Sequence, residues 1–396
     1  MSSRDEAAAP VPTVDVGELL GKLDRGDHVV ILDVRNDEEF KDWKLEALRP
    51  VETVHLPYFE FIEDADASIA KTPKGHDLVV LCAQGGSSEM IVGMLQDAGI
   101  ASRNVKGGMV AYGEHLEPLK VPLAAEDAAR FDVWQINRRG KGCLSYFVVS
   151  GGEAVLVDAM RMTEWYEDFA RQIGVRIVHV LDTHIHADHI SGGPALASRL
   201  GVPYSVNAGP DFELRQEVAP LTDGQILQVG GAHGVSIEVR IIRTPGHTPG
   251  STSFLVDRRY LLTGDTLFVA SVGRPDLGGH VVEWGHALFD TLKRRLADLP
   301  GETRVLPAHY GGIGEISAEG VVWSRLADLR RTVPEMQIAT ADAFVAAVRG
   351  AVKEPPKAYA EIIQVNLGAA ASEERISEWE LGKNQCAASA KKAAGA

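Results

Sequence analysis

A buried strand that runs directly into a cluster of histidine and aspartate residues is the feature that most limits how this chain can fold. The apolar run RIVHVLDT, residues 176–183, is followed at once by His184, His186, Asp188 and His189. The end of a strand is where an open sheet can point side chains into a common crevice. The chain therefore needs a sheet whose edge gathers this turn and further polar side chains around one site.

Three later segments carry a single histidine or aspartate in the same setting. His247 lies in PGHTPGS, Asp265 in TGDTLF and His309 in LPAHYGG, each close to the end of a strand-like run. Taken singly, each histidine reads as a structural residue, because satisfied core imidazoles are commoner than ligands. Taken together with the 184–189 turn they indicate a metal site, since burying so many polar groups without a cation costs several kcal/mol.

The spacing within the turn indicates how ligands are shared. Residues i and i+2 of an extended turn project to one side, so His184 and His186 can share one ion. Asp188 and His189 are expected to begin the next helical turn and to point elsewhere. Imidazole and carboxylate suit zinc, iron or manganese, and the lack of clustered cysteines argues against a structural zinc site.

Composition excludes several classes of protein. The chain has 396 residues, of which 45% are hydrophobic and 24% charged, which is typical of two or three globular domains. The net charge of −15 disfavours nucleic acid and anionic lipid as partners. We find no apolar run long enough to span a membrane and no secretory signal, and three cysteines are too few for a disulfide framework. A cytoplasmic protein is expected.

Two α/β units are predicted. The continuous apolar runs at 29–34 and 78–83 alternate with helical patterns, which is typical of a small domain with a parallel sheet. Strand-like runs from residue 131 onward predict an antiparallel meander, with sheets packed together and helices outside. We predict a disordered tail over 1–12, a first domain over 13–118, a linker over 119–130, a second domain over 131–335 and a helical C-terminal extension over 336–396.

The second domain resembles the metallo-β-lactamase superfamily. The resemblance is carried by the pattern THxHxDH at 183–189, GHT at 246–248, GD at 264–265 and the late His309. It implies an αββα sandwich with metal at the sheet edge. Members of this superfamily include lactamases, thioesterases of the glyoxalase II type, nucleases and persulfide dioxygenases.

Three segments indicate which branch of the superfamily the second domain resembles. The run from 135 to 159 resembles glyoxalase II and persulfide dioxygenases, and DTLFVASVGRPDL (265–277) and PPKAYAEIIQVNLG (355–368) resemble persulfide dioxygenases. The resemblance implies one Fe(II) per chain held by His184, His247 and Asp265, with open positions that oxygen activation requires. Glutathione persulfide, or another thiol persulfide, and O2 would be converted to thiol and sulfite.

In that branch the remaining polar residues of the motif would orient ligands and water; they are His186, Asp188, His189 and His309. In the alternative, a thioester hydrolase of glyoxalase II type, the same residues hold two metal ions (zinc, iron or manganese) and a bridging hydroxide, with Asp265 shared. Spacing does not separate the two cases.

Two further residues are candidate substrate contacts. Arg274 can pair with a glutathione carboxylate, or form a structural salt bridge with Asp276 or Asp265. The persulfide dioxygenase pattern PAHDY becomes Pro307-Ala-His309-Tyr310-Gly here, so the tyrosine stands one place closer to the histidine.

Cys82 ends a buried strand and opens the loop CAQGGSS (82–88), which leads into a helix. Backbone N–H groups at a helix N-terminus favour an anion and make a thiolate available as a nucleophile. The alternative is a buried structural thiol. We expect Cys143 to be a core residue. We expect Asp33 and Arg35 to form a structural ion pair, and Cys386 has no assigned role.

The first domain resembles a rhodanese module. LDVRNDEEF (32–40), HLP (55–57), the Cys82 loop and KGGMVAYG (106–113) follow in the family's order. The resemblance implies that Cys82 carries sulfane sulfur as a persulfide. Ala83 and Ser87 stand where thiosulfate-using members carry arginine, which disfavours thiosulfate as the donor. A non-catalytic binding or dimerising module is the alternative, and the sequence does not decide between a monomer and a homo-oligomer.

Overall fold

The chain divides into two compact units, which are described separately below. The computed structural model describes residues 10–231, 234–276, 279–350, 355 and 358–384. One unit contains the chain up to Glu117 together with Arg138–Lys141, and the other contains Pro118–Asn137 and the chain from Gly142 onward. Most of the expected disordered tail (residues 1–9), Cys386 and the end of the expected helical extension (residues 385–396) lie outside the described residues.

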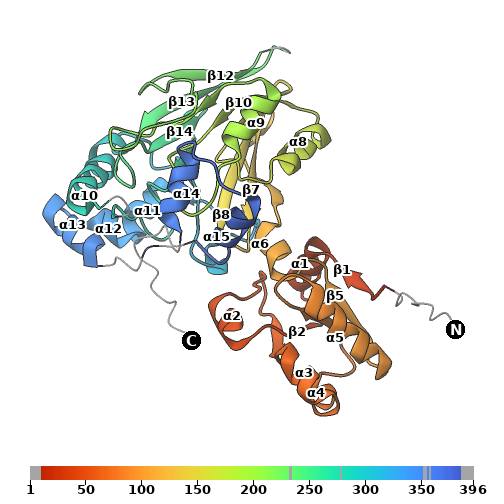
Figure 1. Ribbon diagram of the computed structural model, residues 1–396. Helices are drawn as coiled ribbons and strands as arrows, with labels where there is room; N and C mark the ends of the chain where they lie inside the picture. Colours follow the sequence, from red (N-terminus) through yellow and green to blue (C-terminus); the bar gives the residue numbers. More distant parts are fainter. Residues whose placement is uncertain (1–9, 232–233, 277–278, 351–354, 356–357, 385–396) are drawn as a thin grey trace. The chain divides into compact units, whose positions relative to one another are not determined.

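The first unit contains a parallel five-stranded sheet, as the sequence predicts (Figure 1, red to orange). Its strand order is β1-β5-β4-β2-β3. The strands are β1 Thr13–Val14, β2 Val29–Asp33, β3 Glu52–His55, β4 Asp77–Leu81 and β5 Ser102–Val105. The helices are α1 Val16–Arg25, α2 Asp37–Asp42, α3 Tyr58–Glu63, α4 Ala65–Lys71, α5 Gly86–Asp97 and α6 Gly108–Glu114.

The apolar runs of the first unit exist because the central strands are covered on both faces. Alternate residues of a strand point to opposite faces. Val29 and Ile31 accordingly join the core beside α1, whereas Val30 and Leu32 join the core on the other face, beside α5. A strand buried on both faces cannot show a polar alternation, so it reads as a continuous apolar run.

Asp33 and Arg35 form a buried ion pair at the end of β2. The Arg35 guanidinium donates to Asp33 Oδ2 at 2.7 Å and to the backbone carbonyls of Glu39 and Trp43 at 3.0 and 2.7 Å. Both side chains of the pair are almost fully buried. Arg35 therefore joins the strand to the segment around α2, which is a structural role.

The second unit is an αββα sandwich, which confirms the predicted fold class. In the described part of the chain, one sheet has the order β11-β10-β9-β8-β7-β6 and the other β12-β13-β14-β15-β16-β17. The strands of the first sheet are β6 Glu117–Lys120, β7 Phe131–Arg138, β8 Cys143–Ser150, β9 Glu153–Val157, β10 Arg176–Leu181 and β11 Tyr204–Ser205. Those of the second are β12 Ile226–Gly230, β13 Ser236–Arg243, β14 Thr252–Val256, β15 Tyr260–Gly264, β16 Arg304–Pro307 and β17 Ser324–Arg325.

The core of the second unit lies between its two sheets. Residues from both sheets, such as Val148, Val157, Val239 and Phe254, form one buried apolar cluster.

The helices of the second unit are α7 Ala125–Ala128, α8 Thr163–Gln172, α9 Gly193–Leu200, α10 Val281–Asp290 with a π-helical continuation at Thr291–Arg295, a 3₁₀ turn at Ile313–Glu315, α11 Leu326–Thr332, α12 Pro334–Gln337, α13 Ala341–Gly350, α14 Tyr359–Asn366 and α15 Glu373–Trp379. None of the described helices has the length and apolar character that crossing a membrane requires.

The segment expected to be a linker, residues 119–130, contains the end of β6 and helix α7. It is anchored by Tyr260 of β15, whose hydroxyl donates to the Asp127 carboxylate at 2.9 Å and accepts from the Ala124 N–H at 3.0 Å. These contacts fasten the segment to the second unit.

Replacing Arg35 with alanine should lower the free energy of unfolding of the first unit by about 3–5 kcal/mol, because it leaves the Asp33 carboxylate buried without its cation. Hydrogen exchange of peptides covering β2 and β4 in the full chain measures this change. Arg25→Ala is the matched control, since the Arg25–Asp27 pair is solvent-exposed, and it should cost no more than about 1 kcal/mol. Equal protection in the two variants would contradict the structural role of Arg35.

Candidate metal centre

The polar motifs meet at the ends of strands in the second unit. His184, His186, Asp188 and His189 follow β10, and Asp265 directly follows β15. His247 lies in the turn between β13 and β14, and His309 follows β16. The 184–189 segment is an irregular loop, and α9 begins only at Gly193. The expectation that Asp188 and His189 begin a helical turn is therefore wrong.

Within the described residues, the side chains that could hold a metal ion form three buried groups. The first is His184, His247 and Asp265; the second is Cys143, Asp188, His189 and His309; the third is Asp158, Asp182 and His186. The rings of His184 and His186 lie 4.3 Å apart, yet the structure places them in different groups.

The first group brings two imidazoles and one carboxylate oxygen together. Nε2 of His184 lies 3.8 Å from Asp265 Oδ2, and Nε2 of His247 lies 3.6 Å from the same oxygen. All three side chains are buried, and neither His184 Nε2 nor Asp265 Oδ2 has a hydrogen-bond partner in the described structure. Metal bonds of about 2.1 Å place neighbouring ligands about 3 Å apart, so a small contraction would suit one cation.

Hydrogen bonds on the far side of each imidazole fix its orientation. The Thr183 hydroxyl lies 2.9 Å from His184 Nδ1 and also contacts the Asp158 carboxylate at 3.0 Å. His247 Nδ1 lies 2.9 Å from the carbonyl oxygen of Arg274 and is suited to donate to it. Both arrangements leave Nε2 as the nitrogen that faces Asp265, which is how protein partners orient metal-binding histidines.

The electrostatics suit ligands in their unprotonated forms. Burial and the neighbouring His186 lower the pKa of His184 well below its ordinary value, and burial also lowers the pKa of His247. Burial raises the pKa of Asp265, but the imidazoles of His309 and His184 outweigh it and leave that pKa below its ordinary value. Neutral imidazoles and an ionised carboxylate are the forms that bind a cation.

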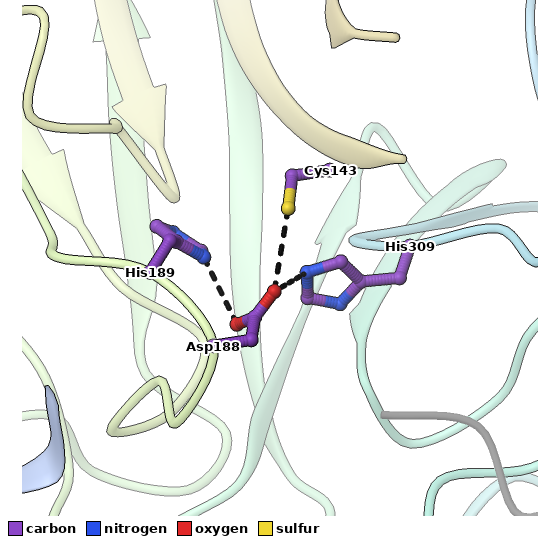
Figure 2. A group of neighbouring side chains, drawn as sticks. All are labelled: Cys143, Asp188, His189 and His309. Carbon is purple, nitrogen blue, oxygen red and sulfur yellow. Dashed lines mark hydrogen bonds and ion pairs between the residues drawn. The ribbon is translucent and has the colours of Figure 1, made fainter. Parts of the chain in front are cut away.

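The second group, shown in Figure 2, surrounds the Asp188 carboxylate. Nε2 of His309 lies 2.9 Å and Sγ of Cys143 lies 3.3 Å from Asp188 Oδ2, while Nδ1 of His189 lies 3.0 Å from Oδ1. Burial lowers the pKa of His189, but the Asp188 carboxylate outweighs it and raises that pKa to about 10. The two groups are linked, because His309 Nδ1 lies 2.5 Å from Asp265 Oδ1.

Cys143 is a member of this cluster, so the expectation that it is only a core residue is incomplete. It begins β8 and pairs with His309 in an isolated β-bridge. Its Sγ reaches Asp188, which lies 45 residues further along the chain. A cysteine inside an apolar strand gave no signal of that neighbour, because only the pairing of distant segments creates it.

The C-terminal extension contacts the histidine loop directly. Asn366 of α14 donates to the backbone carbonyls of His186 and His189 at 2.9 and 2.8 Å and accepts from the Ser191 N–H at 2.9 Å. The Glu380 carboxylate accepts from the Ile190 N–H at 2.6 Å. Sequence reasoning missed both residues, although Asn366 lies in the 355–368 run that resembles persulfide dioxygenases.

The two predicted substrate contacts have protein partners. Arg274 donates to both Asp276 carboxylate oxygens at 2.8 and 2.7 Å and is buried, which is the structural pair left open by the sequence. The Tyr310 hydroxyl donates to Asn137 Oδ1 at 3.0 Å.

The Cys82 loop forms a second candidate site, in the first unit. Cys82 Sγ accepts hydrogen bonds from the Gly85 N–H and the Ser88 hydroxyl, both at 3.0 Å. Gly108 packs against the loop with a φ of +58°, and a Cβ there would lie 2.3 Å from the Cys82 carbonyl oxygen. The glycine is required because both its conformation and the close approach exclude a side chain.

Comparisons with known proteins agree with this architecture. The family described as the metallo-beta-lactamase superfamily matches residues 138–309, and the rhodanese-like domain matches residues 15–115. The chain therefore belongs to the metallo-beta-lactamase superfamily and carries a rhodanese-like domain before that fold. Membership of this superfamily makes it a metal-dependent enzyme.

Relatives in two enzyme classes have similar identities to the chain. It is 32% identical to an uncharacterized protein of Aquifex aeolicus over 40% of this chain and 79% of that protein. It is 32% identical to the mitochondrial persulfide dioxygenase ETHE1 of Bos taurus (41% and 61%) and 34% identical to the hydroxyacylglutathione hydrolase of Acidiphilium cryptum (42% and 63%). The match thus spans about three fifths of these two enzymes. The crystal structure of ETHE1 from Myxococcus xanthus superposes with a TM-score of 0.51 at 25% identity, covering 59% of this chain and 96% of that one.

Replacing His247 with alanine should abolish metal retention by the first group, because it removes one of the three donor side chains of that group. Iron per chain is measured after anaerobic loading with Fe(II) and desalting. His286→Ala is the control, since that histidine is half-exposed on α10 and belongs to none of the three groups. Unchanged iron content in His247→Ala, with a circular dichroism spectrum like that of the wild type, would refute the ligand assignment.

Proposed function

We propose that the second unit is a non-haem iron dioxygenase that oxidises a thiol persulfide to sulfite. The observation that carries the proposal is the convergence of His184, His247 and Asp265, two imidazoles and one carboxylate, on one point. This donor set leaves coordination positions open and is the one used by non-haem Fe(II) oxygenases. The relatives named persulfide dioxygenase support the choice of reaction.

The residues present suit such an ion. His184 Nε2 and Asp265 Oδ2 are buried atoms without hydrogen-bond partners in the described structure, and both face the same space as His247 Nε2. When bound, Fe(II) would supply the one-electron chemistry that O2 requires to react with a sulfur nucleophile.

The chain's own residues hold this geometry. Thr183 and the carbonyl of Arg274 orient the two imidazoles, and His309 binds the Asp265 oxygen that faces away from them. The burial of all three ligand side chains keeps bulk water from the reacting centre, which protects a reactive sulfur intermediate from side reactions.

The proposed reaction balances as thiol persulfide plus O2 plus water giving thiol, sulfite and two protons. The terminal sulfur passes from oxidation state zero to plus four, and O2 accepts those four electrons. Glutathione is the first thiol to test as carrier, because the second class of relatives is named for a glutathione thioester.

A dinuclear thioester hydrolase of glyoxalase II type is the second candidate. The observation that favours it is His186, both of whose ring nitrogens are buried without a hydrogen-bond partner in the described structure. Its ring lies 4.3 Å from that of His184 and 4.2 Å from that of His189, between the two donor groups. A second metal ion there would account for one of these nitrogens, because an imidazole binds an ion through a single nitrogen.

The two candidates differ in what they consume. On anaerobically iron-loaded protein, glutathione persulfide should cause O2 uptake with an equal amount of sulfite formed, and S-lactoylglutathione should not be cleaved. The O2 electrode and a sulfite assay measure the first, and release of free thiol measures the second. Thioester cleavage without persulfide-dependent O2 uptake would establish the hydrolase instead.

We further propose that Cys82 carries sulfane sulfur between donors and acceptors. The Gly85 N–H and the Ser88 hydroxyl stabilise negative charge on its sulfur by hydrogen bonding. The match of the rhodanese-like family over residues 15–115 supports this role.

Cys82→Ser should abolish sulfur transfer from a persulfide to cyanide while O2 uptake by iron-loaded protein continues, because the two sites use different residues. Thiocyanate formation and O2 uptake are measured on the same preparation. Cys143→Ser is the matched cysteine control and should retain thiocyanate formation. Undiminished transfer in Cys82→Ser would favour the passive-module alternative.

A further inference from the structure

Helices α14 and α15, blue in Figure 1, bring two buried polar side chains to the loop after β10, which carries four of the candidate metal-site residues. Asn366 ends α14 and donates to the carbonyl oxygens of His186 and His189. Glu380 follows α15 and accepts from the Ile190 N–H. Asn366 and Glu380 are 5% and 4% exposed, and neither belongs to the three donor groups.

The Glu380 carboxylate joins two loops of the second unit. Its Oε1 accepts from the Ile190 N–H at 2.6 Å, and its Oε2 accepts from Nε of Arg161, in the loop after β9, at 3.0 Å. The backbone links the same two loops, because the Gly192 N–H donates to the Ala159 carbonyl at 2.7 Å. A charged acceptor makes a stronger hydrogen bond than a neutral one, so this buried carboxylate contributes strongly to the spacing of the loops after β9 and β10.

The spacing of these loops affects a proposed iron ligand. Asp158 begins the loop after β9, and its carboxylate accepts from the Thr183 N–H at 2.7 Å and contacts the Thr183 hydroxyl at 3.0 Å. That hydroxyl lies 2.9 Å from His184 Nδ1. Asp158 has a φ of +55°, a conformation that a non-glycine residue keeps only when its surroundings hold it. A shift between the two loops would therefore move the His184 ring relative to Asp265.

Apolar packing holds the two helices against the loop. Ile190 of the loop, Ile362 of α14 and Ile376 of α15 form one buried cluster. This cluster removes water from the neighbouring polar contacts, and a hydrogen bond is electrostatically stronger in such surroundings. The contacts of Asn366 and Glu380 with the loop thus depend on the docking of both helices.

We propose that Glu380 is a positioning residue for the candidate metal centre, acting through Arg161 and the Ile190 N–H, and that Asn366 assists it from α14. The inference rests on the proposed function only in taking His184, His247 and Asp265 as the iron ligands. It applies equally to a dioxygenase and to a hydrolase, because both need the His184 ring in place.

Glu380→Ala should lower the Fe(II) affinity of the full-length protein roughly tenfold, the lower end of the about 10–100-fold losses that follow removal of outer partners of metal ligands. Anaerobic competition with a chromophoric chelator measures this affinity. In metal-free protein, hydrogen exchange of peptides covering 158–163 and 184–192 should become faster, because the two loops lose their bridge. Glu378→Ala is the matched control, since that carboxylate lies on α15 and is exposed, and it should change neither quantity.

A double-mutant cycle tests the bridge itself. Arg161→Ala combined with Glu380→Ala should weaken Fe(II) binding no more than Glu380→Ala alone, because both substitutions remove the same link. Additive losses would contradict the bridge. Should Glu380→Ala fail to fold, Glu380→Gln has the same shape and keeps an acceptor for the Ile190 N–H, and it should still weaken Fe(II) binding because it carries no charge to pair with Arg161.

Fe(II) affinity and loop exchange equal to those of Glu378→Ala would overturn the proposal. A lower melting temperature of Glu380→Ala with unchanged Fe(II) affinity would also overturn it, because Glu380 would then be structural only. Neither measurement uses turnover, so absence of persulfide-dependent O2 uptake would refute the dioxygenase and leave these results standing. A wild type that binds no Fe(II) would refute the iron site, whereas exchange of the metal-free loops would still decide whether the bridge exists.

Discussion

The ionic link between His309 and Asp265 is the contact on which the site of the second unit depends. It joins two groups of buried donors that come from different strands, and it leaves Asp265 Oδ2 facing His184 and His247. Buried polar atoms are costly unless they are paired, so every side chain around this link needs a partner. The structure meets that demand with Thr183, the Arg274 carbonyl and Asp188, and it leaves unpartnered the few nitrogens and oxygens that a cation could bind.

The loop that carries four of these residues has little regular structure of its own, so its shape comes from its surroundings. Asn366 holds two of its carbonyls and Glu380 binds one of its amides, from helices that lie far along the chain. The C-terminal extension thus acts as a brace for the candidate metal centre. A loop held by side chains of a packed helix keeps its ligands in place with or without an ion, which reduces the entropy lost on binding.

The rhodanese-like unit also holds its candidate reactive group in place through tertiary contacts, but it uses backbone groups more than charged side chains. Its sulfur is contacted by one backbone N–H and one hydroxyl, so glycines and a serine rather than histidines determine this site. Gly108 allows a neighbouring segment to approach the Cys82 carbonyl, and the Gly85 N–H contacts the sulfur. The Arg35–Asp33 pair stabilises the same parallel sheet at the end of β2, where Asp33 is paired with Leu81, the residue that precedes Cys82.

Local sequence patterns predicted the parallel sheet, the packed sheets with helices outside and the histidine and aspartate residues near the strand ends, because buried strands form apolar runs and the polar residues follow them directly. The αββα order was implied by the resemblance to the metallo-β-lactamase superfamily. The grouping of those residues was decided by tertiary structure. His186 lies in a different group from its neighbour His184, and Cys143 joins Asp188 across 45 residues. The contacts of Asn366 and Glu380 span 180 and 190 residues. Spacing within one segment cannot specify such contacts, because they form only when the packing of both sheets and the C-terminal helices brings distant side chains together.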